Sequence, residues 1–266
     1  YEITTRLVGS EMCIRDRVGS RIISLANGPR FIAAKRSDRS MDQFYNHDDK
    51  EAEKKKTQYT TFDDAGRFTG FTVREEGNNV VVTANYKLGC FDQAVWTIAP
   101  DGTAAIDFTY NFSGVVDLMG VMFDYPEDKV LSKRWVGDGP YRVWQNRLHG
   151  PQLGVWENEY NDPIPAESFT YPEFKGYFAN VQWMTLKTQE GTISICNRTP
   201  QNYVGVYQPR DGRDGLLYTF PATGISLMKV IPPVRNKVNT TDLIGPSSQA
   251  FWADGAYGGG ITLKFE

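Results

Sequence analysis

Residues 68–112 read FTGFTVREEGNNVVVTANYKLGCFDQAVWTIAPDGTAAIDFTYNF, and their regular pattern indicates the fold class. Segments in which apolar and polar residues alternate are separated by short turns rich in Gly, Asn, Pro and Asp. A period of two is typical of strands with one buried face, and these turn residues favour hairpins. The pattern therefore predicts a meander in an antiparallel sheet with one wet face. Its predicted strands are Phe68–Arg74, Val80–Tyr86, Ala94–Ile98 and Ala104–Phe112.

The chain reads as β on both sides of this meander. Before it, strands at Arg21–Leu25 and Phe31–Ala33 are predicted around an Asn27-Gly28-Pro29 turn. After it, a Gln189-Glu190-Gly191 turn is expected to join the first two of five further strands. These predicted strands are Ala179–Thr188, Thr192–Asn197, Tyr203–Tyr207, Ile225–Val230 and Ile261–Phe265.

Long loops rich in aromatic residues separate the later strands, and they are expected at Gly137–Pro151, Trp156–Tyr177 and Ile231–Gly260. Strands do not alternate with helical periods anywhere, which excludes a TIM barrel and a Rossmann sheet. The predicted fold class is all-β, with two large antiparallel sheets packed together and functional loops on one face.

Composition narrows the function classes. The 266 residues carry a formal charge of −3, from 29 basic and 32 acidic residues, so a basic surface for nucleic acid or an anionic membrane is not expected. No apolar run reaches the ~18 residues of a spanning helix. Three cysteines without CxxC spacing, and the two histidines His47 and His149, offer no metal site or disulfide scaffold. No metal or cofactor is predicted.

The first 20 residues are treated separately. Residues 7–20 read LVGSEMCIRDRVGS, which resembles a translated adapter junction, with a genuine irregular segment as the alternative. Residues 1–20 are therefore predicted to be a non-native or disordered leader with few native contacts, and residues 21–266 to be one domain. The run at 47–56 is expected to be a solvated loop or a short surface helix. The compartment stays open, with a periplasmic or secreted bacterial enzyme favoured over a cytoplasmic one.

Residues 122–150, MFDYPEDKVLSKRWVGDGPYRVWQNRLHG, carry a family resemblance. The element that runs from Trp135 through Gly-Asp-Gly-Pro140 to Trp144 and Arg147 resembles the Trp-x-Gly-x-Gly-Pro element of the C-terminal domain, or small chain, of β-galactosidases in glycoside hydrolase family 2. Softer likeness extends over residues 21–266, through 171–176 and 244–246. The specific part is the Trp135–Arg147 element.

This resemblance implies an antiparallel β-supersandwich of the galactose-mutarotase type, joined to a catalytic barrel that this chain lacks. In the family the two catalytic glutamates lie on that barrel, so no catalytic residue is expected here and the isolated chain is expected not to hydrolyse β-galactosides. The small chain instead completes the sugar pocket, in some members with an aromatic platform. That platform would fall near Ile225 or Ser226, where this sequence has no tryptophan.

A saccharide site needs an aromatic plane with planar polar groups around it. Two of the predicted loops supply such groups, and the predicted substrate-binding residues are Arg142, Trp144, Arg147, His149, Tyr171 and Glu173. Each also has a structural interpretation: Trp144 braces its loop, Arg147 ties the loop down, and the acidic residues are solvated. The expected partners are a β-galactoside or related glycan and the other domains of the parent enzyme.

Two other functions remain open. The first is a free-standing carbohydrate-binding module, which the loop aromatics favour. The second is an aldose mutarotase, which needs a base and an acid at the sugar ring, commonly Glu and His with a second His. His47 lies in a charged run far from the aromatic loops, so this function is disfavoured.

Overall fold

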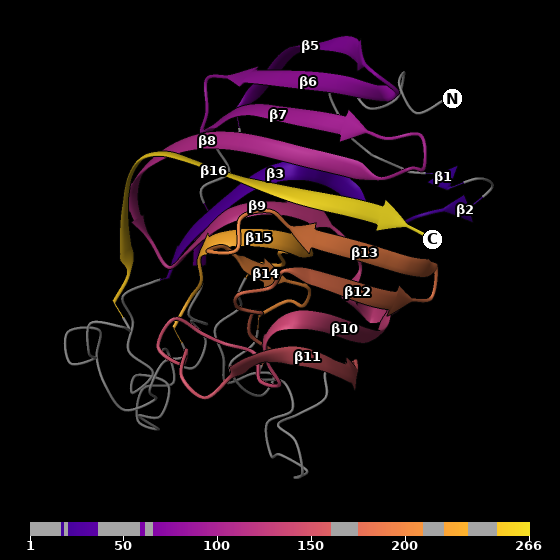
Figure 1. Ribbon diagram of the computed structural model, residues 1–266. Coiled ribbons are helices and arrows are strands. Elements are labelled where there is room, and N and C mark those ends of the chain that lie inside the picture. The colour runs from indigo at the N-terminus through magenta and orange to yellow at the C-terminus, as the bar shows by residue number, and fades with distance from the viewer. Residues whose placement is uncertain are drawn as a thin grey trace.

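The computed structural model describes residues 17–18, 21–36, 59–61, 66–160, 175–209, 221–233 and 249–266. These residues form a nine-stranded and a five-stranded antiparallel sheet that share one core (Figure 1). A third, two-stranded sheet pairs β1, Arg17–Val18, with β2, Arg21–Ile22. The prediction of an all-β, two-sheet antiparallel fold is confirmed.

The nine-stranded sheet has the order β11-β10-β12-β13-β16-β8-β7-β6-β5. Strands β5 to β8 are consecutive antiparallel neighbours, so the predicted meander is confirmed. The bounds of the nine strands are β5 Arg67–Glu76, β6 Asn79–Lys87, β7 Phe91–Ile98, β8 Ala104–Val116, β10 Val130–Gly139, β11 Gln152–Glu159, β12 Trp183–Thr188, β13 Gly191–Asn197 and β16 Phe251–Phe265.

The five-stranded sheet has the order β14-β15-β9-β3-β4 and lies behind the larger sheet in Figure 1. A short 3-10 helix, η1 at Glu127–Lys129, links β9 to β10. The bounds of the five strands are β3 Ala26–Arg36, β4 Tyr59–Thr61, β9 Leu118–Asp124, β14 Tyr203–Gly205 and β15 Ile225–Val230.

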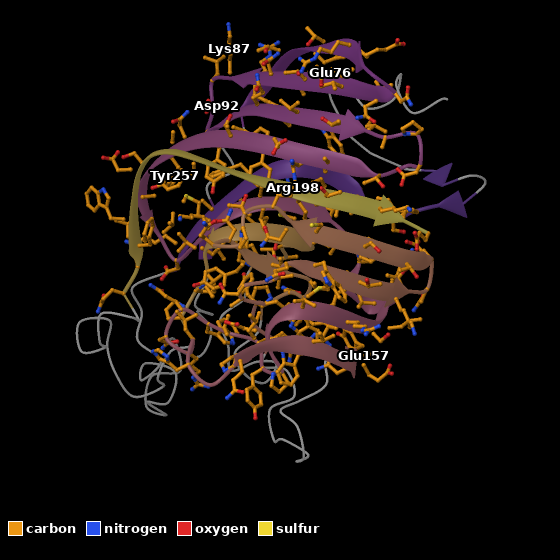
Figure 2. The ribbon with its side chains drawn as sticks, viewed as in Figure 1. Glu76, Lys87, Asp92, Glu157, Arg198 and Tyr257 are labelled. Carbon is orange, nitrogen blue, oxygen red and sulfur yellow. The ribbon has the colours of Figure 1, made fainter. Side chains whose placement is uncertain are left out.

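Side-chain alternation assigns each face of the nine-stranded sheet a different environment. In β8, Ile106 and Phe108 are buried in the core between the sheets, whereas Asp107 and Thr109 between and after them are exposed. A strand with one buried and one wet face alternates in this way. The outer face faces the viewer in Figure 2, with Arg198 near its middle.

The central strands β3 and β9 of the five-stranded sheet are buried on both faces. In β3, Phe31 and Ala33 belong to the core between the sheets, and Ile32 and Ala34 belong to a second apolar cluster. Six of the seven residues of β9 are buried as well, because this strand also has apolar side chains packed against both of its faces. Something other than a sheet must therefore cover the back of this sheet, and that cover is a set of loops.

Three predicted boundaries are wrong: in β3 and β16 a strand distant in sequence supplies the pairing, and in β11 the preceding strand β10 does. The chain does not turn at Asn27-Gly28-Pro29: β3 runs through these residues, with a register irregularity against β9 between Ala26 and Arg30. β16 begins at Phe251 and pairs with β8 along its length, although its glycines predicted a loop up to residue 260. β11 likewise replaces the start of a predicted loop.

Two further predictions can be placed. The Gln189-Glu190-Gly191 turn between β12 and β13 is confirmed, and β12 begins at Trp183 rather than at Ala179. The predicted helical run at 47–56, and the leader apart from residues 17–18, lie outside the described residues. Within the described ranges, no helix is long and apolar enough to cross a membrane.

Candidate functional site

The loop after β10 is anchored on the back of the five-stranded sheet. Val143 donates its backbone N–H to the Tyr177 carbonyl at 2.7 Å, and Tyr177 returns the bond at 2.9 Å. Both side chains are buried in the second apolar cluster, against Met122 of β9 and Met228 of β15. The loop is thus part of the protein's interior and holds the residues that follow it at a fixed place.

Trp144 lies in the same cluster, with 3% of its surface exposed. A Cβ on the neighbouring Gly176 would lie 2.8 Å from the Trp144 Nε1, so only glycine permits this close packing. A ring buried in this way has no face to offer a sugar. The structural interpretation of Trp144, that it braces its loop, is the one that its burial supports.

The other predicted residues of this loop have different surroundings. Arg142 is half-buried, and its guanidinium carbon lies 5.3 Å from the centroid of the Tyr207 ring. Arg147 follows a tight turn in which its N–H donates to the Trp144 carbonyl at 2.8 Å. The side chains of Arg147 and His149 are exposed. The structure therefore turns Arg142 inward while Arg147 and His149 lie at the surface.

Three other predicted positions can be checked against the described residues. Tyr171 and Glu173 lie outside them, so their role in binding stays a prediction. Ile225 and Ser226, where the family resemblance would put an aromatic platform, are fully buried in β15. No side chain at these two positions could reach a ligand at the surface.

A hollow of about 160 Å³ lies beside the loop, at the end of β10. Asp138 enters it from the Gly137-Asp138-Gly139 segment, and Asn180 donates its Nδ2–H to the Asp138 Oδ2 at 2.7 Å. Asn180 has a φ of +50°, a left-handed conformation that Asn tolerates better than most residues. We call this the Asp138 hollow; its lining residues are Asp138, Leu148, Ala179, Asn180, Pro200, Gln201 and Tyr203.

The Asp138 hollow suits part of a polar ligand. Its volume is below the ~300 Å³ at which sites for whole drug-sized molecules begin, so it fits one small ring or one edge of a larger molecule. The Asp138 carboxylate accepts hydrogen bonds from hydroxyl groups, the amide of Gln201 can both donate and accept, and Tyr203 contributes a half-buried ring. Leu148 adds an apolar wall from the predicted loop.

Sequence reasoning missed Asp138, Asn180 and Tyr203. Asp138 lies inside the element that carries the family resemblance, but it was not among the predicted binding residues. A single carboxylate between glycines at a strand end was the available signal. Asn180 had no such signal, because its place beside Asp138 depends on the backbone bond from the Asp138 N–H to the Ala179 carbonyl, at 2.9 Å.

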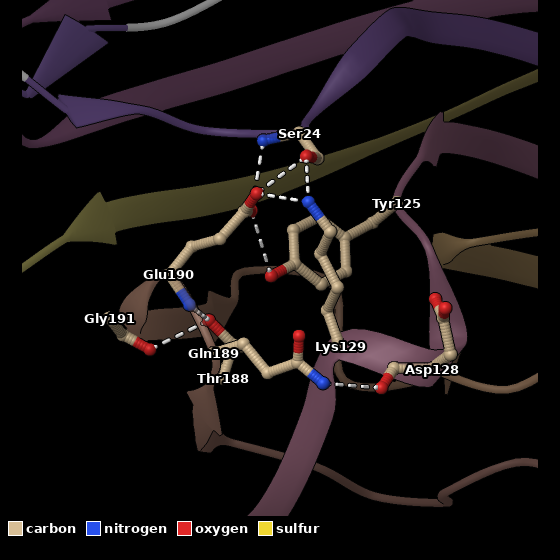
Figure 3. A network of polar contacts seen from close by, with 8 residues as sticks. All are labelled: Ser24, Tyr125, Asp128, Lys129, Thr188, Gln189, Glu190 and Gly191. Carbon is tan, nitrogen blue, oxygen red and sulfur yellow. Dashed lines mark hydrogen bonds and ion pairs between the residues drawn. The ribbon is translucent and has the colours of Figure 1, made fainter.

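A second polar cluster has a structural role (Figure 3). Glu190 accepts hydrogen bonds from the Ser24 N–H at 3.0 Å and the Ser24 hydroxyl at 2.6 Å, and it forms an ion pair with Lys129. Desolvation raises the pKa of Glu190, but the hydrogen bonds from Lys129 and Ser24 outweigh it and lower the pKa to about 2. Burial raises the pKa of the neighbouring Tyr125 to about 12. These contacts tie the chain before β3 to the β12–β13 turn.

Metal ligands do not gather in the part of the chain that the structure describes. No group of three or more His, Cys, Asp or Glu side chains there could hold an ion. The chemistry available at the Asp138 hollow is therefore hydrogen bonding by one carboxylate and by amides, with an arginine and a histidine exposed on the adjacent loop.

Comparisons with known proteins bear on this site. The family model of the beta galactosidase small chain matches residues 18–225, which include the whole loop and the Asp138 hollow. A search of curated proteins finds no match. Among solved structures, the chain is similar to a GalM/aldose epimerase homologue from C. elegans, at 8% identity and a TM-score of 0.35, over 74% of this chain and 69% of that one.

Proposed function

This chain belongs to the β-galactosidase small-chain family, and from that membership we propose that it is a carbohydrate-binding domain that completes the substrate pocket of a retaining glycoside hydrolase of family 2. In this proposal the acid and the nucleophile come from a barrel domain of the same enzyme, since a retaining mechanism needs two carboxyl groups ~5–5.5 Å apart across the scissile bond. The small chain binds and orients the sugar.

The observation that carries the proposal is the place of Asp138. The residue belongs to the element that resembles the family, and the structure sets it in a hollow, with Asn180 bonded to one carboxylate oxygen. In the proposal Asp138 accepts hydrogen bonds from sugar hydroxyls, and Arg147 and His149 donate from the exposed rim of the loop. Tyr171 and Glu173 stay in the proposed site, whereas Trp144 holds the loop in place and Arg142 turns inward towards Tyr207.

The test is Asp138→Asn in the intact enzyme. The amide keeps the shape of the side chain but loses its charge, and a hydrogen bond to a charged group contributes ~1.5–3 kcal/mol. We expect kcat/KM for an aryl β-galactoside to fall about tenfold, with the melting temperature unchanged. Asp254→Asn, at an exposed position of β16, is the matched control. Equal kcat/KM values for the two variants would overturn the proposal.

Two alternatives are separated from this function by simple observations. A free-standing carbohydrate-binding module would bind glycans without an associated barrel, so a parent reading frame without a barrel would favour it. A mutarotase would interconvert the anomers of galactose, which polarimetry on the 266-residue chain detects. His149 is the one histidine in the described part of the chain, and mutarotase chemistry commonly uses two.

A further inference from the structure

A second and larger hollow lies on the outer face of the nine-stranded sheet, with a volume of about 440 Å³. Gln93 and Val95 line it from β7, Asp107 and Thr109 from β8, Gly260 from β16 and Arg198 from the segment after β13. Figure 2 shows Arg198 near the centre of this face. We call it the Asp107 hollow. Its volume falls within the ~300–1,000 Å³ range of small-molecule sites.

The hollow is built by a segment that folds back over the sheet. The Arg198 N–H donates to the Gly260 carbonyl at 2.9 Å, and the Gly260 N–H donates to the Thr199 hydroxyl at 2.9 Å. A Cβ on Gly260 would lie 2.8 Å from the Asp107 Oδ1 and 3.0 Å from the Arg198 Nη2. The missing side chain therefore lets the segment approach, and it leaves bare backbone as part of the floor.

The charges of the Asp107 hollow select a neutral ligand. The Arg198 Nη2 lies 2.6 Å from the Asp107 Oδ1, so the two charges balance. The side chains are 37% and 58% exposed, and a ligand can reach both. An anion attracted by Arg198 is repelled by Asp107. A cation attracted by Asp107 is repelled by Arg198. A molecule with many hydroxyl groups can donate to the carboxylate and accept from the guanidinium at once.

The Asp107 hollow and the Asp138 hollow share one wall. Arg198 and Thr199 line the first, and Pro200 and Gln201, the next two residues, line the second. The two hollows are therefore lined by consecutive residues of one segment. This adjacency favours an extended ligand over two unrelated small molecules.

We propose that the Asp107 hollow is a second saccharide subsite, which binds a neutral chain of galactosyl units that continues from the Asp138 hollow. The choice of galactosyl units rests on the proposed function, whereas the location of the subsite rests on the Asp107–Arg198 pair and the hollow beside it. The subsite binds the chain away from the bond that is cleaved, so it serves longer substrates and leaves short ones unaffected.

The experiment titrates the 266-residue chain with β-1,4-linked galactotetraose and with trigalacturonic acid by calorimetry. The unsubstituted chain should bind the tetraose more tightly than the acid. Arg198→Ala and Asp107→Asn should each weaken tetraose binding at least fivefold. Arg74→Ala is the matched control, because Arg74 forms an exposed pair with Glu76 at 3.2 Å on the edge strand β5 of the same sheet. This control should bind the tetraose as the unsubstituted chain does.

Three results would overturn the subsite: no tetraose binding by the unsubstituted chain at millimolar concentration, tighter binding of trigalacturonic acid, or equal tetraose affinity of Arg198→Ala and Arg74→Ala. In the intact enzyme, Arg198→Ala should raise KM for a galactan by a larger factor than KM for an aryl galactoside. If Asp138→Asn leaves activity intact while Arg198→Ala weakens the tetraose, the proposed function fails and the subsite stands. If Asp138→Asn lowers activity while Arg198→Ala leaves tetraose binding unchanged, the subsite fails and the proposed function stands.

Discussion

The back of the five-stranded sheet and the outer face of the nine-stranded sheet use similar residues for opposite purposes. On the back, Trp144 and Tyr177 are buried with apolar strand residues, and loops close the surface. On the outer face, Trp183 is 37% exposed and Arg198 lies at an open hollow. The residue type is therefore a poor guide to the role of a tryptophan or an arginine in this fold. The face on which the residue lies decides it.

The two charged clusters repeat this contrast. Glu190 accepts a hydrogen bond from Ser24 and forms an ion pair with Lys129, and its side chain is 17% exposed. Within the part of the chain that the structure describes, Asp107 forms an ion pair with Arg198 alone, and its side chain is 58% exposed. Several bonds to one half-buried carboxylate stabilise a fold, because each group would be costly to leave unpaired. An exposed pair contributes little to stability and stays available to a ligand.

Trp144→Ala should have the largest effect. Truncation of a buried Trp removes its burial and leaves a cavity, which costs ~3–5 kcal/mol. We expect the free energy of unfolding in urea to fall by about 3–4 kcal/mol. Trp183→Ala, on the open face of β12, is the matched variant and should cost about 1 kcal/mol or less, since its side chain already contacts water.

Equal losses for the two tryptophan variants would break the contrast between the faces. A loss below about 1 kcal/mol for Trp144→Ala would mean that the ring is accessible in solution, and it would restore Trp144 as a sugar platform. The measurement should also report the m-value, because an unchanged m-value shows that the native and unfolded ensembles remain comparable.

Glu190→Gln should have a smaller effect that depends on pH. The folded-state pKa of Glu190 is about 2, below its ordinary value of 4.5. The ionised carboxylate therefore stabilises the protein above about pH 5, and this contribution is lost as the pH falls through 4.5 towards 2. The excess stability of the unsubstituted chain over Glu190→Gln should shrink by about 1 kcal/mol between pH 7 and pH 3. Solvent screening keeps the effect this small, because Lys129 is 29% exposed.

Urea titrations at pH 7, 5 and 3 measure this difference. If the difference in the free energy of unfolding between the two proteins is the same at all three pH values, the ion pair with Lys129 does not hold Glu190 ionised. Glu76→Gln, in the exposed pair with Arg74, is the control and should show no such difference at any pH.

The meander could be predicted because its signals are local. Each strand from β5 to β8 alternates along a few residues and ends in its own turn, so neighbours in sequence become neighbours in the sheet. β3 and β16 have no such signal. Gly28-Pro29 and the glycines of residues 255–260 favour turns by themselves, but β3 pairs with β9 on both sides of Gly28-Pro29, and β16 pairs with β8 through its glycines. Long-range pairing of this kind overrides local preference.

The candidate site could be predicted only in part. The family-like element led to the loop after β10, in which Arg147 and His149 are exposed, and the binding role of these residues stays a prediction. The burial of Trp144 was not predictable, because a loop has no periodicity that reveals its buried side. The Asp107 hollow could not be predicted from the sequence either, because residues of β7, β8 and β16 and of the segment after β13 come together in it only in the folded chain. Its one local sign, the run Gly258-Gly259-Gly260, lay in a stretch that was predicted to be a loop.

Arg198→Ala should have the smallest effect on stability. Its pair with Asp107 is exposed, and exposed pairs contribute ~0–1 kcal/mol. The segment that carries Arg198 is held by other bonds: the Asn197 Nδ2–H donates to the Asn202 carbonyl at 3.1 Å, and the Thr199 N–H donates to the Asn197 Oδ1 at 2.9 Å. We expect the free energy of unfolding to fall by about 0.5 kcal/mol or less, which lowers the melting temperature by roughly 1–2 °C. Calorimetric melting of Arg198→Ala beside Arg74→Ala measures this. A drop of several degrees for Arg198→Ala alone would mean that the side chain braces the segment, and the open face would then be stabilised in the same way as the closed one.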